Sequence, residues 1–248
     1  MSDLTGKVAI VTGASKGIGA AIARAFATAG ATVAVNYSSS KADADRVVGE
    51  IVKAGGRAIA IQADVAKRAD VQRLFAETKE NLGRPNILVN NAGVYSFAPL
   101  EAVTEEDFHR QFNTNVLGAI LAVQEAVKAF DGAGGSIINF STIASTNPSP
   151  NTLVYSASKS AIDTITRELA IELAGQGIRV NAIAPGMTET EGFAAAGLSA
   201  ESAKALGFSL PMGRIGQPDD IARVALFLAS DQSAWVTGER ISVSGGQR

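Results

Sequence analysis

The sequence predicts an α/β fold in which one parallel β-sheet is covered by helices on both faces. Short runs of β-branched residues alternate with longer helical patterns along the whole chain. Of the 248 residues, 46% are hydrophobic, which is enough to form a substantial core. The chain contains no Pro-rich linker and no low-complexity tract. We therefore expect a single domain that spans residues 1–248.

In the first half of the chain, strand and helix patterns follow one another without interruption. The first strand, Val8–Val11, runs into a helix, Ile18–Ala29, whose closing turn ends at Gly30. The same rhythm continues with a strand at Thr32–Val35, a helix at Ala42–Lys53 closed by Gly55-Gly56, a strand at Arg57–Ile61, a helix at Val71–Glu80 and a strand at Ile87–Asn90.

The second half continues the rhythm with one exception. It contains a helix at Val116–Phe130, a strand at Ile137–Phe140, a helix at Tyr155–Leu173, a strand at Ile178–Ile183, a helix at Ile221–Ala229 and a strand at Arg240–Val243. The exception is the segment 187–211, which is long for a connection and is typical of a lid. Strands separated by helices of this length form right-handed βαβ units, so we expect a doubly wound parallel sheet of about seven strands.

The composition excludes several classes of function. The 22 basic and 24 acidic residues nearly cancel, and no basic tract is present that would bind nucleic acid or an anionic membrane. The chain has no cysteine, which rules out disulfides and thiolate metal sites, and we expect no metal. We interpret the single histidine, His109, as part of a solvated helix face. Without a signal peptide or a membrane-spanning run, we expect a cytoplasmic protein.

A glycine-rich turn follows the first strand. It reads Thr12-Gly13-Ala14-Ser15-Lys16-Gly17-Ile18-Gly19 and leads directly into a helix. Glycines allow the backbone to turn sharply and approach a pyrophosphate, and the free N–H groups of the first helical turn bind the anion. The turn therefore predicts a dinucleotide site, with a strand-to-helix turn that binds no ligand as the alternative.

The end of the second strand favours NADP(H) over NAD(H). NAD sites usually place an acidic residue there to bind the ribose 2′-hydroxyl. This strand ends in Asn36-Tyr37-Ser38-Ser39-Ser40-Lys41, without a carboxylate. The hydroxyls of Ser38 and Ser39, together with Lys16, suit a 2′-phosphate that a carboxylate would repel. The alternative is that these are ordinary loop residues.

A tyrosine and a lysine lie four residues apart on a predicted helix. The segment Tyr155-Ser156-Ala157-Ser158-Lys159 places both side chains on one helix face. A free tyrosine has a pKa of about 10, and a nearby cation lowers the pKa toward the range useful for acid–base catalysis. We expect Tyr155 to protonate a carbonyl oxygen as hydride reaches the carbon. The alternative is an ordinary pair on a helix surface.

Polar residues follow two strands at the sheet edge where open α/β proteins bind ligands. Ser141 and Thr142 come directly after the fifth strand, where a hydroxyl would hydrogen-bond the substrate oxygen or satisfy local backbone. The stretch Asn90-Asn91-Ala92-Gly93 follows another strand at the same edge. Asn115 lies in a helical stretch, where its amide lowers helix propensity and suggests a specific partner.

Together these motifs resemble those of the short-chain dehydrogenase/reductase superfamily over the whole chain. The matching residues are Thr12, Gly13, Gly17 and Gly19 in the turn, Asn90, Asn91, Ala92 and Gly93, then Tyr155 and Lys159, and finally Pro185-Gly186. The resemblance implies a Rossmann-type fold and a catalytic set of Asn115, Thr142, Tyr155 and Lys159. In the family a serine usually stands thirteen positions before the tyrosine, where this chain has Thr142, so Thr142 is expected to replace it and Ser141 remains a competitor.

The resemblance also implies how the cofactor and the subunits are held. Lys159 would hold the nicotinamide ribose, Asn115 would support a water relay, and Asp64 and Val65 would bracket the adenine. The segment from Pro185 to Thr190 would contact the nicotinamide, with Thr188 or Thr190 touching the carboxamide. The family implies a homotetramer in which Val116–Phe130 and Tyr155–Leu173 pack against a partner's helices.

The expected substrate is an uncharged, fairly apolar ketone, which would make the protein a carbonyl reductase. The segment from Gly192 to Phe208 is small and apolar, and Tyr95, Phe97, Ile143 and Val154 are expected nearby. Alternatives from the family are a 3-oxoacyl-carrier-protein reductase and a glucose-type sugar dehydrogenase. The segments 131–135 and 175–177 offer no basic residue for an acidic carrier protein. A non-catalytic NADP(H) sensor or scaffold is the alternative of another class, and Tyr155 with Lys159 argues against it.

Overall fold

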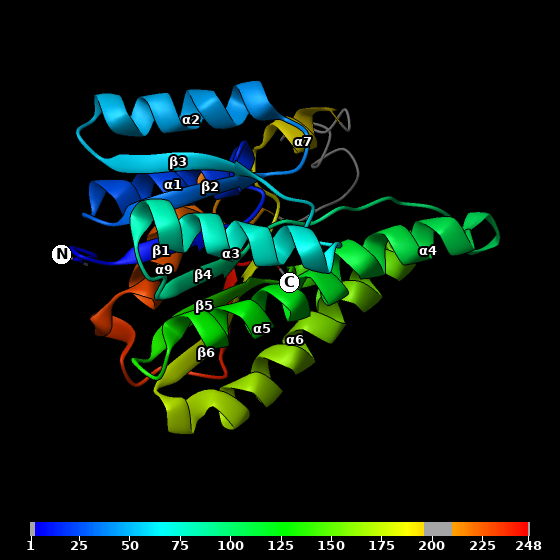
Figure 1. Cartoon of the computed structure of the whole chain (residues 1–248). Helices are drawn as coiled ribbons and strands as arrows, with labels where there is room; N and C mark the ends of the chain where they lie inside the picture. The colour runs from blue at the N-terminus through cyan, green and yellow to red at the C-terminus, as the bar shows by residue number, and fades with distance from the viewer. Residues whose placement is uncertain (1–2, 196–209, 248) are drawn as a thin grey trace.

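The computed structural model describes residues 3–195 and 210–247 and is built around one parallel sheet (Figure 1). Seven strands are hydrogen-bonded in the order β3-β2-β1-β4-β5-β6-β7, and each neighbouring pair is parallel. The strands are β1 (Val8–Val11), β2 (Thr32–Tyr37), β3 (Arg57–Gln62), β4 (Ile87–Asn90), β5 (Gly135–Phe140), β6 (Ile178–Pro185) and β7 (Arg240–Val243). The predicted doubly wound sheet is confirmed.

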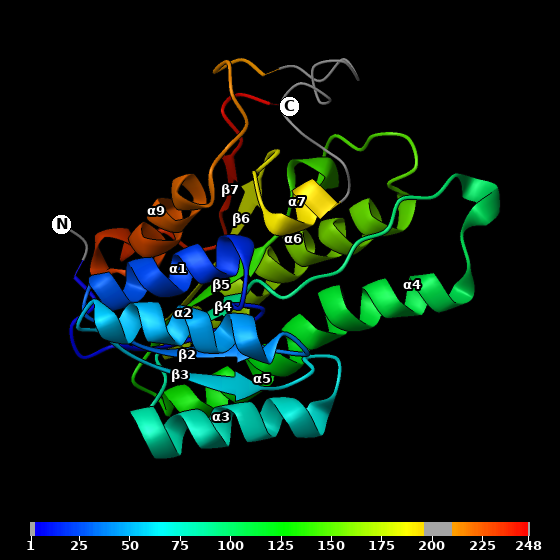
Figure 2. The same cartoon turned by 90° about the horizontal axis from the view of Figure 1, so that it is seen from above.

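Helices cover both faces of this sheet (Figure 2). On one face lie α1 (Gly17–Thr28), α2 (Lys41–Lys53) and α9 (Pro218–Ala229). On the other face lie α3 (Arg68–Leu82), α5 (Gly118–Phe130) and α6 (Leu153–Leu173). All residues of β1 and β4 are buried, which explains why their sequences are continuous apolar runs instead of alternating patterns.

The two faces have separate cores that share the strands. Along β1, Ala9 and Val11 pack into the core under α1 and α9, whereas Val8 and Ile10 pack into the core under α3 and α5. This alternation is the two-residue period of a strand. Each fully buried Ile or Leu contributes roughly 2 kcal/mol through removal of apolar surface from water. The sheet is therefore held rigidly between two layers, and its carboxyl edge is a fixed platform.

The helical region that ends in α5 is longer and more irregular than predicted. Instead of one helix from Val116, the chain forms α4 (Glu105–Phe112), then a π-helical turn at Asn113–Leu117, then α5. The Thr104 hydroxyl caps α4 by accepting a hydrogen bond from the N–H of Asp107. The predicted solvated helix face at His109 is confirmed, because this side chain is 58% exposed. The sequence predicted only this solvated face and gave no bounds for α4, whose Phe108 and Phe112 rings stack one helical turn apart.

The order of the strands reverses between β1 and β4. From β1 the chain winds outward to β3, and from β4 it winds outward in the other direction to β7. Loops leaving the carboxyl ends of β1 and β4 diverge, and α/β proteins of this type bind ligands in the crevice that results. The glycine turn follows β1 and the Asn90–Gly93 stretch follows β4, so the topology brings these motifs together.

The predicted lid is described only at its two ends. The short helix α7 (Glu191–Ala195) lies at the beginning of the segment, and an isolated bridge pairs Thr188 with Gly216 beyond its end. Residues 196–209 of the predicted lid lie outside the described residues. Among the helices in the described ranges, none is long and apolar enough to cross a membrane.

Candidate active site

The glycine turn between β1 and α1 packs closely against the loop after β4. A Cβ at Gly13, whose φ is +63°, would lie 2.9 Å from the Cα of Ala92. A Cβ at Gly19 would lie 2.5 Å from the Nδ2 of Asn91. That Nδ2 donates hydrogen bonds to the carbonyl oxygens of Thr12 at 2.8 Å and Gly13 at 3.0 Å. Neither position has room for a side chain, so these glycines are required by the close approach of two loops.

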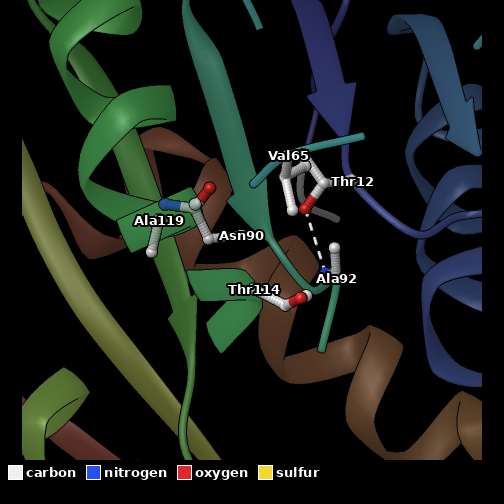
Figure 3. Close-up of a pocket in the computed structure, with 7 residues that line it drawn as sticks. Thr12, Val65, Asn90, Ala92, Thr114 and Ala119 are labelled. Carbon is white, nitrogen blue, oxygen red and sulfur yellow. Dashed lines mark hydrogen bonds between the residues drawn. The ribbon is translucent and has the colours of Figure 1, made fainter. Parts of the chain in front are cut away.

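Thr12 fixes the position of the glycine turn relative to the loop after β4. Its Oγ1 donates to the carbonyl of Val89 at 3.1 Å and accepts from the backbone N–H groups of Asn91 and Ala92, each at 3.0 Å (Figure 3). Behind Thr12 lies a cavity of about 10 Å³. Its lining residues are Thr12, Val65, Asn90, Ala92, Thr114, Gly118 and Ala119. This volume is about that needed to hold one water molecule, so the residues around the turn are closely packed.

A carboxylate from another part of the chain meets the amino end of α1. The backbone N–H of Gly17 donates to Oε2 of Glu191 at 3.0 Å. Thr190 lies over the same turn, because a Cβ at Gly17 would come within 3.2 Å of its Cγ2. The first N–H groups of a helix and its dipole favour an anion, and the Glu191 carboxylate is a stand-in for one. The turn therefore fits the pyrophosphate of a dinucleotide.

The outer end of this site contains a charged cluster in which Lys16 and Arg46 both pair with Asp43. Ser38 and Ser39 are exposed after β2, and the Nζ of Lys16 lies 2.9 Å from Oδ2 of Asp43 in the first turn of α2. The Lys16 ammonium holds the pKa of the Asp43 carboxyl below its usual range. The predicted preference for NADP(H) rested on residues 36–41 and Lys16 and did not include Asp43, which the first turn of α2 places beside the glycine turn.

The other predicted adenosine contacts lie at the same edge of the sheet. Tyr37 is the buried last residue of β2, and Asp64 and Val65 follow β3. Asp64 caps its own turn, where its Oδ1 accepts from the N–H of Ala66 at 3.1 Å. Val65 is buried, and its Cγ2 would lie 2.9 Å from a Cβ at Gly118. Asp64 is therefore the more accessible of the two predicted adenine contacts.

Tyr155 and Lys159 lie on successive turns of α6, as predicted. Lys159 is buried, and its Nζ donates to the carbonyl of Phe140 at the end of β5 at 2.7 Å. A Cβ at Gly93 would lie 3.4 Å from this Nζ and 3.2 Å from Oδ1 of Asn115. The structure therefore brings Asn115 and Lys159 together around Gly93.

Asn115 connects the loop after β4 to α6. From the π-helical turn, its Oδ1 accepts from the N–H of Val94 and its Nδ2 donates to the carbonyl of Val94, both at 2.8 Å. The same Nδ2 lies 3.0 Å from the hydroxyl of Ser158. Extra residues in π-helical turns are frequent at functional sites, and this one aims a buried amide at the loop next to the catalytic helix.

The charge states of Tyr155 and Lys159 differ from the prediction. Burial raises the pKa of Tyr155 to about 12, although a hydrogen bond with the Thr142 hydroxyl offsets part of the rise. Burial also lowers the pKa of Lys159 to about 8, against the favourable charge of Asp163. The predicted lowering of the Tyr155 pKa by Lys159 is wrong, because burial raises this pKa and only the Thr142 side chain opposes the rise. Tyr155 therefore keeps its proton at neutral pH.

Thr142, rather than Ser141, is the hydroxyl residue that meets Tyr155. The Thr142 side chain interacts with the phenol of Tyr155, where it opposes the effect of burial on the tyrosine pKa. Ser141 is 4% exposed, and its Oγ lies 3.3 Å from the hydroxyl of Ser145 on the other side. The backbone at Thr142 is extended, and an extended backbone directs neighbouring side chains to opposite faces. The hydroxyls of Ser141 and Thr142 therefore lie on different sides of the chain.

Two aromatic rings stand next to Tyr155. The rings of Tyr95 and Phe97 are stacked with centroids 5.4 Å apart. Both meet the Tyr155 ring edge-on, at 6.0 Å and 6.2 Å. Tyr95 is 42% exposed and Phe97 is 51% exposed, so they present apolar surface beside Tyr155. A flat apolar molecule would cover that surface.

The predicted nicotinamide contacts lie after β6, at the same sheet edge as Tyr155. A Cβ at Gly186 would lie 2.3 Å from Oε1 of Gln247, so a side chain does not fit next to Pro185. The Thr188 hydroxyl donates to the carbonyl of Gly186 at 3.1 Å, and the Thr190 hydroxyl accepts from the N–H of Phe193 at 3.1 Å. Both threonines are therefore held in place by local hydrogen bonds.

Known proteins are similar to this chain in sequence and in fold. Residues 13–248 match a family model described as Enoyl-(Acyl carrier protein) reductase. The chain is 54% identical to an uncharacterized oxidoreductase of Methylorubrum extorquens, covering 100% of both chains, and 41% identical to a hydroxynaphthalene reductase-like protein of Metarhizium robertsii, covering 98% of this chain and 96% of that one. A crystal structure of a short-chain type dehydrogenase/reductase from Mycobacterium marinum superposes with a TM-score of 0.92 at 36% identity, covering 98% of this chain and 96% of that one. The chain therefore belongs to the short-chain dehydrogenase/reductase superfamily, whose members are oxidoreductases that use a nicotinamide cofactor.

Proposed function

We propose that this oxidoreductase uses NADPH to reduce a ketone attached to, or part of, a flat aromatic ring system. The observation that carries the proposal is the surrounding of Tyr155. Its phenol keeps its proton, interacts with the Thr142 side chain and lies edge-on to the exposed rings of Tyr95 and Phe97. The name of the hydroxynaphthalene reductase-like relative from Metarhizium robertsii supports the same substrate class.

The chemistry follows from the positions of the polar groups. Bound NADPH supplies a hydride to the carbonyl carbon. The Thr142 hydroxyl and the Tyr155 phenol hold the carbonyl oxygen, and Tyr155 gives its proton to that oxygen as negative charge develops there. The buried ammonium of Lys159 stabilises the phenolate that remains, because charges interact strongly where water is excluded. Carbonyl, hydride and proton together give the secondary alcohol.

The residues that would hold NADPH form one continuous edge. The phosphates bind at the amino end of α1, the 2′-phosphate at the end of β2, the adenine after β3, the ribose at α6 and the nicotinamide after β6. In that order the residues are Gly13, Ser15, Gly17, Ile18 and Gly19; Lys16, Tyr37, Ser38 and Ser39; Asp64 and Val65; Asn91, Ala92 and Gly93 with Tyr155 and Lys159; and Pro185, Gly186, Thr188 and Thr190. A 2′-phosphate carries more charge than the Asp43 carboxylate and competes with it for Lys16.

The proposal is tested by following NADPH oxidation at the nicotinamide absorbance with four substrate classes. The panel contains fused-ring aryl ketones, aliphatic diketones, acetoacetyl thioesters and aldoses, each run with NADPH and with NADH. We expect the fused-ring ketones to give the highest kcat/KM, with a preference for NADPH of roughly 10-fold or more. Preference for a thioester or for an aldose would favour the acyl-carrier or sugar alternative. Tight NADPH binding without turnover would favour a sensor.

Removing the Glu191 carboxylate should strengthen NADPH binding. This carboxylate accepts from the N–H of Gly17, where the pyrophosphate would bind, so the two anions compete. Glu191→Gln is expected to lower the Kd of NADPH by roughly 3- to 10-fold, the size of a helix-terminus charge effect. The matched control is Glu189→Gln, because Oε2 of Glu189 accepts from Gln217 instead of from the turn. Fluorescence titration measures both, and equal Kd values for Glu191→Gln and Glu189→Gln would contradict the competition.

We also propose a homotetramer in which α5 and α6 pack against the partner's helices. The support is apolar surface along these two helices. Leu117 is 41% exposed next to α5, and Leu153 and Ile171 on α6 are 54% and 83% exposed. Large exposed aliphatic side chains on neighbouring helices are typical of subunit interfaces.

A further inference from the structure

A buried ion pair lies directly behind Thr142, and the proposed reduction does not yet give it a role. Arg240 extends from β7 to α6, where its Nε lies 3.1 Å from Oδ2 of Asp163. The two side chains are only 17% and 6% exposed. A buried ion pair contributes little net stability, because the desolvation of two charges offsets their attraction. We therefore expect the pair to act through the residues that it contacts.

The guanidinium of Arg240 holds the turn that follows β5. Its Nη2 donates to the carbonyl of Thr142 at 2.8 Å and lies 3.3 Å from Oγ1 of Thr146. Its Nε also lies 3.3 Å from the hydroxyl of Ser145. These contacts reach both ends of the single helical turn Ile143–Ser145. The planar fork of an arginine fixes such a turn in one orientation, which the single ammonium of a lysine does not do.

Asp163 holds the same turn through a second route. The Ser145 hydroxyl lies 2.5 Å from Oδ2 of Asp163 and 2.9 Å from the carbonyl of Thr142, and its one proton goes to the charged acceptor. The hydroxyl of Ser160 donates to the carbonyl of Ser145 at 2.7 Å. Arg240 therefore holds the carbonyl of Thr142, Asp163 holds the side chain of Ser145, and Ser160 holds the carbonyl of Ser145.

Fixing this turn fixes the hydroxyl that meets the catalytic tyrosine. Thr142 is the N-cap residue of the turn, where its Oγ1 accepts from the N–H of Ala144 at 3.3 Å, and its side chain interacts with the phenol of Tyr155. A carbonyl held at 2.8 Å sets the direction of the side chain on the same residue. Asp163 also stands one helical turn beyond Lys159, where its negative charge favours the ammonium form.

We propose that Arg240 and Asp163 are positioning residues for the reduction: they fix the backbone of Thr142 and thereby hold its hydroxyl against Tyr155. This inference rests on the proposed function, because Thr142 orients the substrate oxygen there. The pair touches neither the glycine turn nor the segment after β6 through any of the contacts above. Its loss should therefore affect kcat and leave NADPH binding unchanged.

The first test compares two Arg240 variants with a matched control. Arg240→Lys keeps a positive charge beside Asp163 and loses the fork, whereas Arg240→Met loses both. We expect kcat to fall by roughly 10- to 100-fold in each, with the Kd of NADPH changed by less than about 2-fold. The control is Arg179→Met, because Arg179 on β6 also donates to backbone carbonyls, those of Leu228 and Ser230 at the carboxyl end of α9, at the opposite end of the sheet. Arg179→Met should lose stability while kcat per folded enzyme is retained.

A double-mutant cycle separates positioning from a general structural role. If Arg240 acts through Thr142, then Arg240→Met should lower kcat less than about 3-fold once Thr142→Ala is present. Losses that multiply in the double variant would overturn the proposal. Hydrogen exchange of the 143–147 amides, without cofactor or substrate, should be at least about 10-fold faster in Arg240→Met than in the wild type. Unchanged exchange would also overturn it.

Different results would overturn the proposed function and the positioning role of Arg240 and Asp163. A wild type that binds NADPH but reduces no ketone would overturn the proposed function, and with it the role of the pair in catalysis. Wild-type turnover with a multiplicative cycle would overturn only the positioning role. In both cases the exchange rates report independently whether Arg240 holds the turn.

Discussion

Tyr155→Phe is expected to lower kcat for ketone reduction by roughly 1,000-fold or more while NADPH still binds. The variant keeps the ring that packs edge-on against Tyr95 and Phe97 and removes only the hydroxyl. That hydroxyl is the proton donor beside the Thr142 hydroxyl, and its high pKa of about 12 keeps the proton available at neutral pH. Without it, the carbonyl oxygen, which takes up the electron pair of the C=O π bond as hydride bonds to the carbon, has no positioned acid. Single-turnover NADPH oxidation measures the chemical step directly.

The matched control is Tyr95→Phe, which removes a phenol hydroxyl from the ring 6.0 Å away. This change leaves the aromatic surface in place and should alter kcat by less than about 3-fold. A fluorescence titration should give the same Kd for NADPH in the wild type and in both variants. If Tyr155→Phe retained a tenth of the wild-type kcat, another group would be the acid, and the proposed mechanism would be wrong.

The sheet was predictable because local patterns decide it. A strand buried on both faces, such as β1 or β4, must be apolar throughout, and the glycines at its end mark where the chain turns. The bounds of α4 were not predicted, because only its solvated face around His109 was recognised in the sequence. The π-helical turn at Asn113–Leu117 was missed because it depends on a contact between Asn115 and Val94, far apart in the sequence.

The candidate site was predictable only as far as spacing determines it. Tyr155 and Lys159 share a helix face because they are four residues apart, and no tertiary contact is needed to place them so. The direction of the Tyr155 pKa was predicted wrongly, because burial depends on rings and strands brought from elsewhere.

Three charged contacts of the site were beyond the reach of sequence patterns. Glu191 lies 174 positions after the N–H that it accepts from, and Arg240 lies 98 positions after the Thr142 carbonyl that it holds. Asp43 is close in sequence to the predicted 2′-phosphate residues, yet only the direction of α2 shows that it meets Lys16. Such long-range pairs carry no periodicity, so an isolated sequence gives no signal for them.

Lys159→Met is expected to lower kcat by roughly 100-fold or more and to stabilise the protein at neutral pH. The first effect follows because the variant removes the charge that stabilises the Tyr155 phenolate. The second follows because an ammonium buried in the protein is poorly solvated. Burial lowers the pKa of Lys159 from 10.5 to about 8, which corresponds to roughly 3 kcal/mol of unfavourable free energy for the charged form. Loss of the hydrogen bond to Phe140 offsets about 1 to 2 kcal/mol of this gain.

The stabilisation should depend on pH with a defined sign. The folded-state pKa is below the unfolded value, so the contribution of Lys159 to stability is present above pH 10.5 and is lost as pH falls through about 8. Wild type should therefore gain stability relative to Lys159→Met between pH 8 and pH 10.5. We expect the variant to be about 1 to 2 kcal/mol more stable at pH 7 and no more stable than wild type near pH 10.

Urea unfolding of both proteins at pH 7, 8.5 and 9.5 tests the sign, with Lys128→Met as the control. The side chain of Lys128 on α5 is 64% exposed, so its replacement should give a difference in unfolding free energy that does not change over this range. If the difference in unfolding free energy between wild type and Lys159→Met were also independent of pH, Lys159 would not be a charged, buried side chain in the native protein. If the difference falls as pH rises, the native protein tolerates an unfavourable buried ammonium that benefits catalysis, as expected where stability and activity oppose each other.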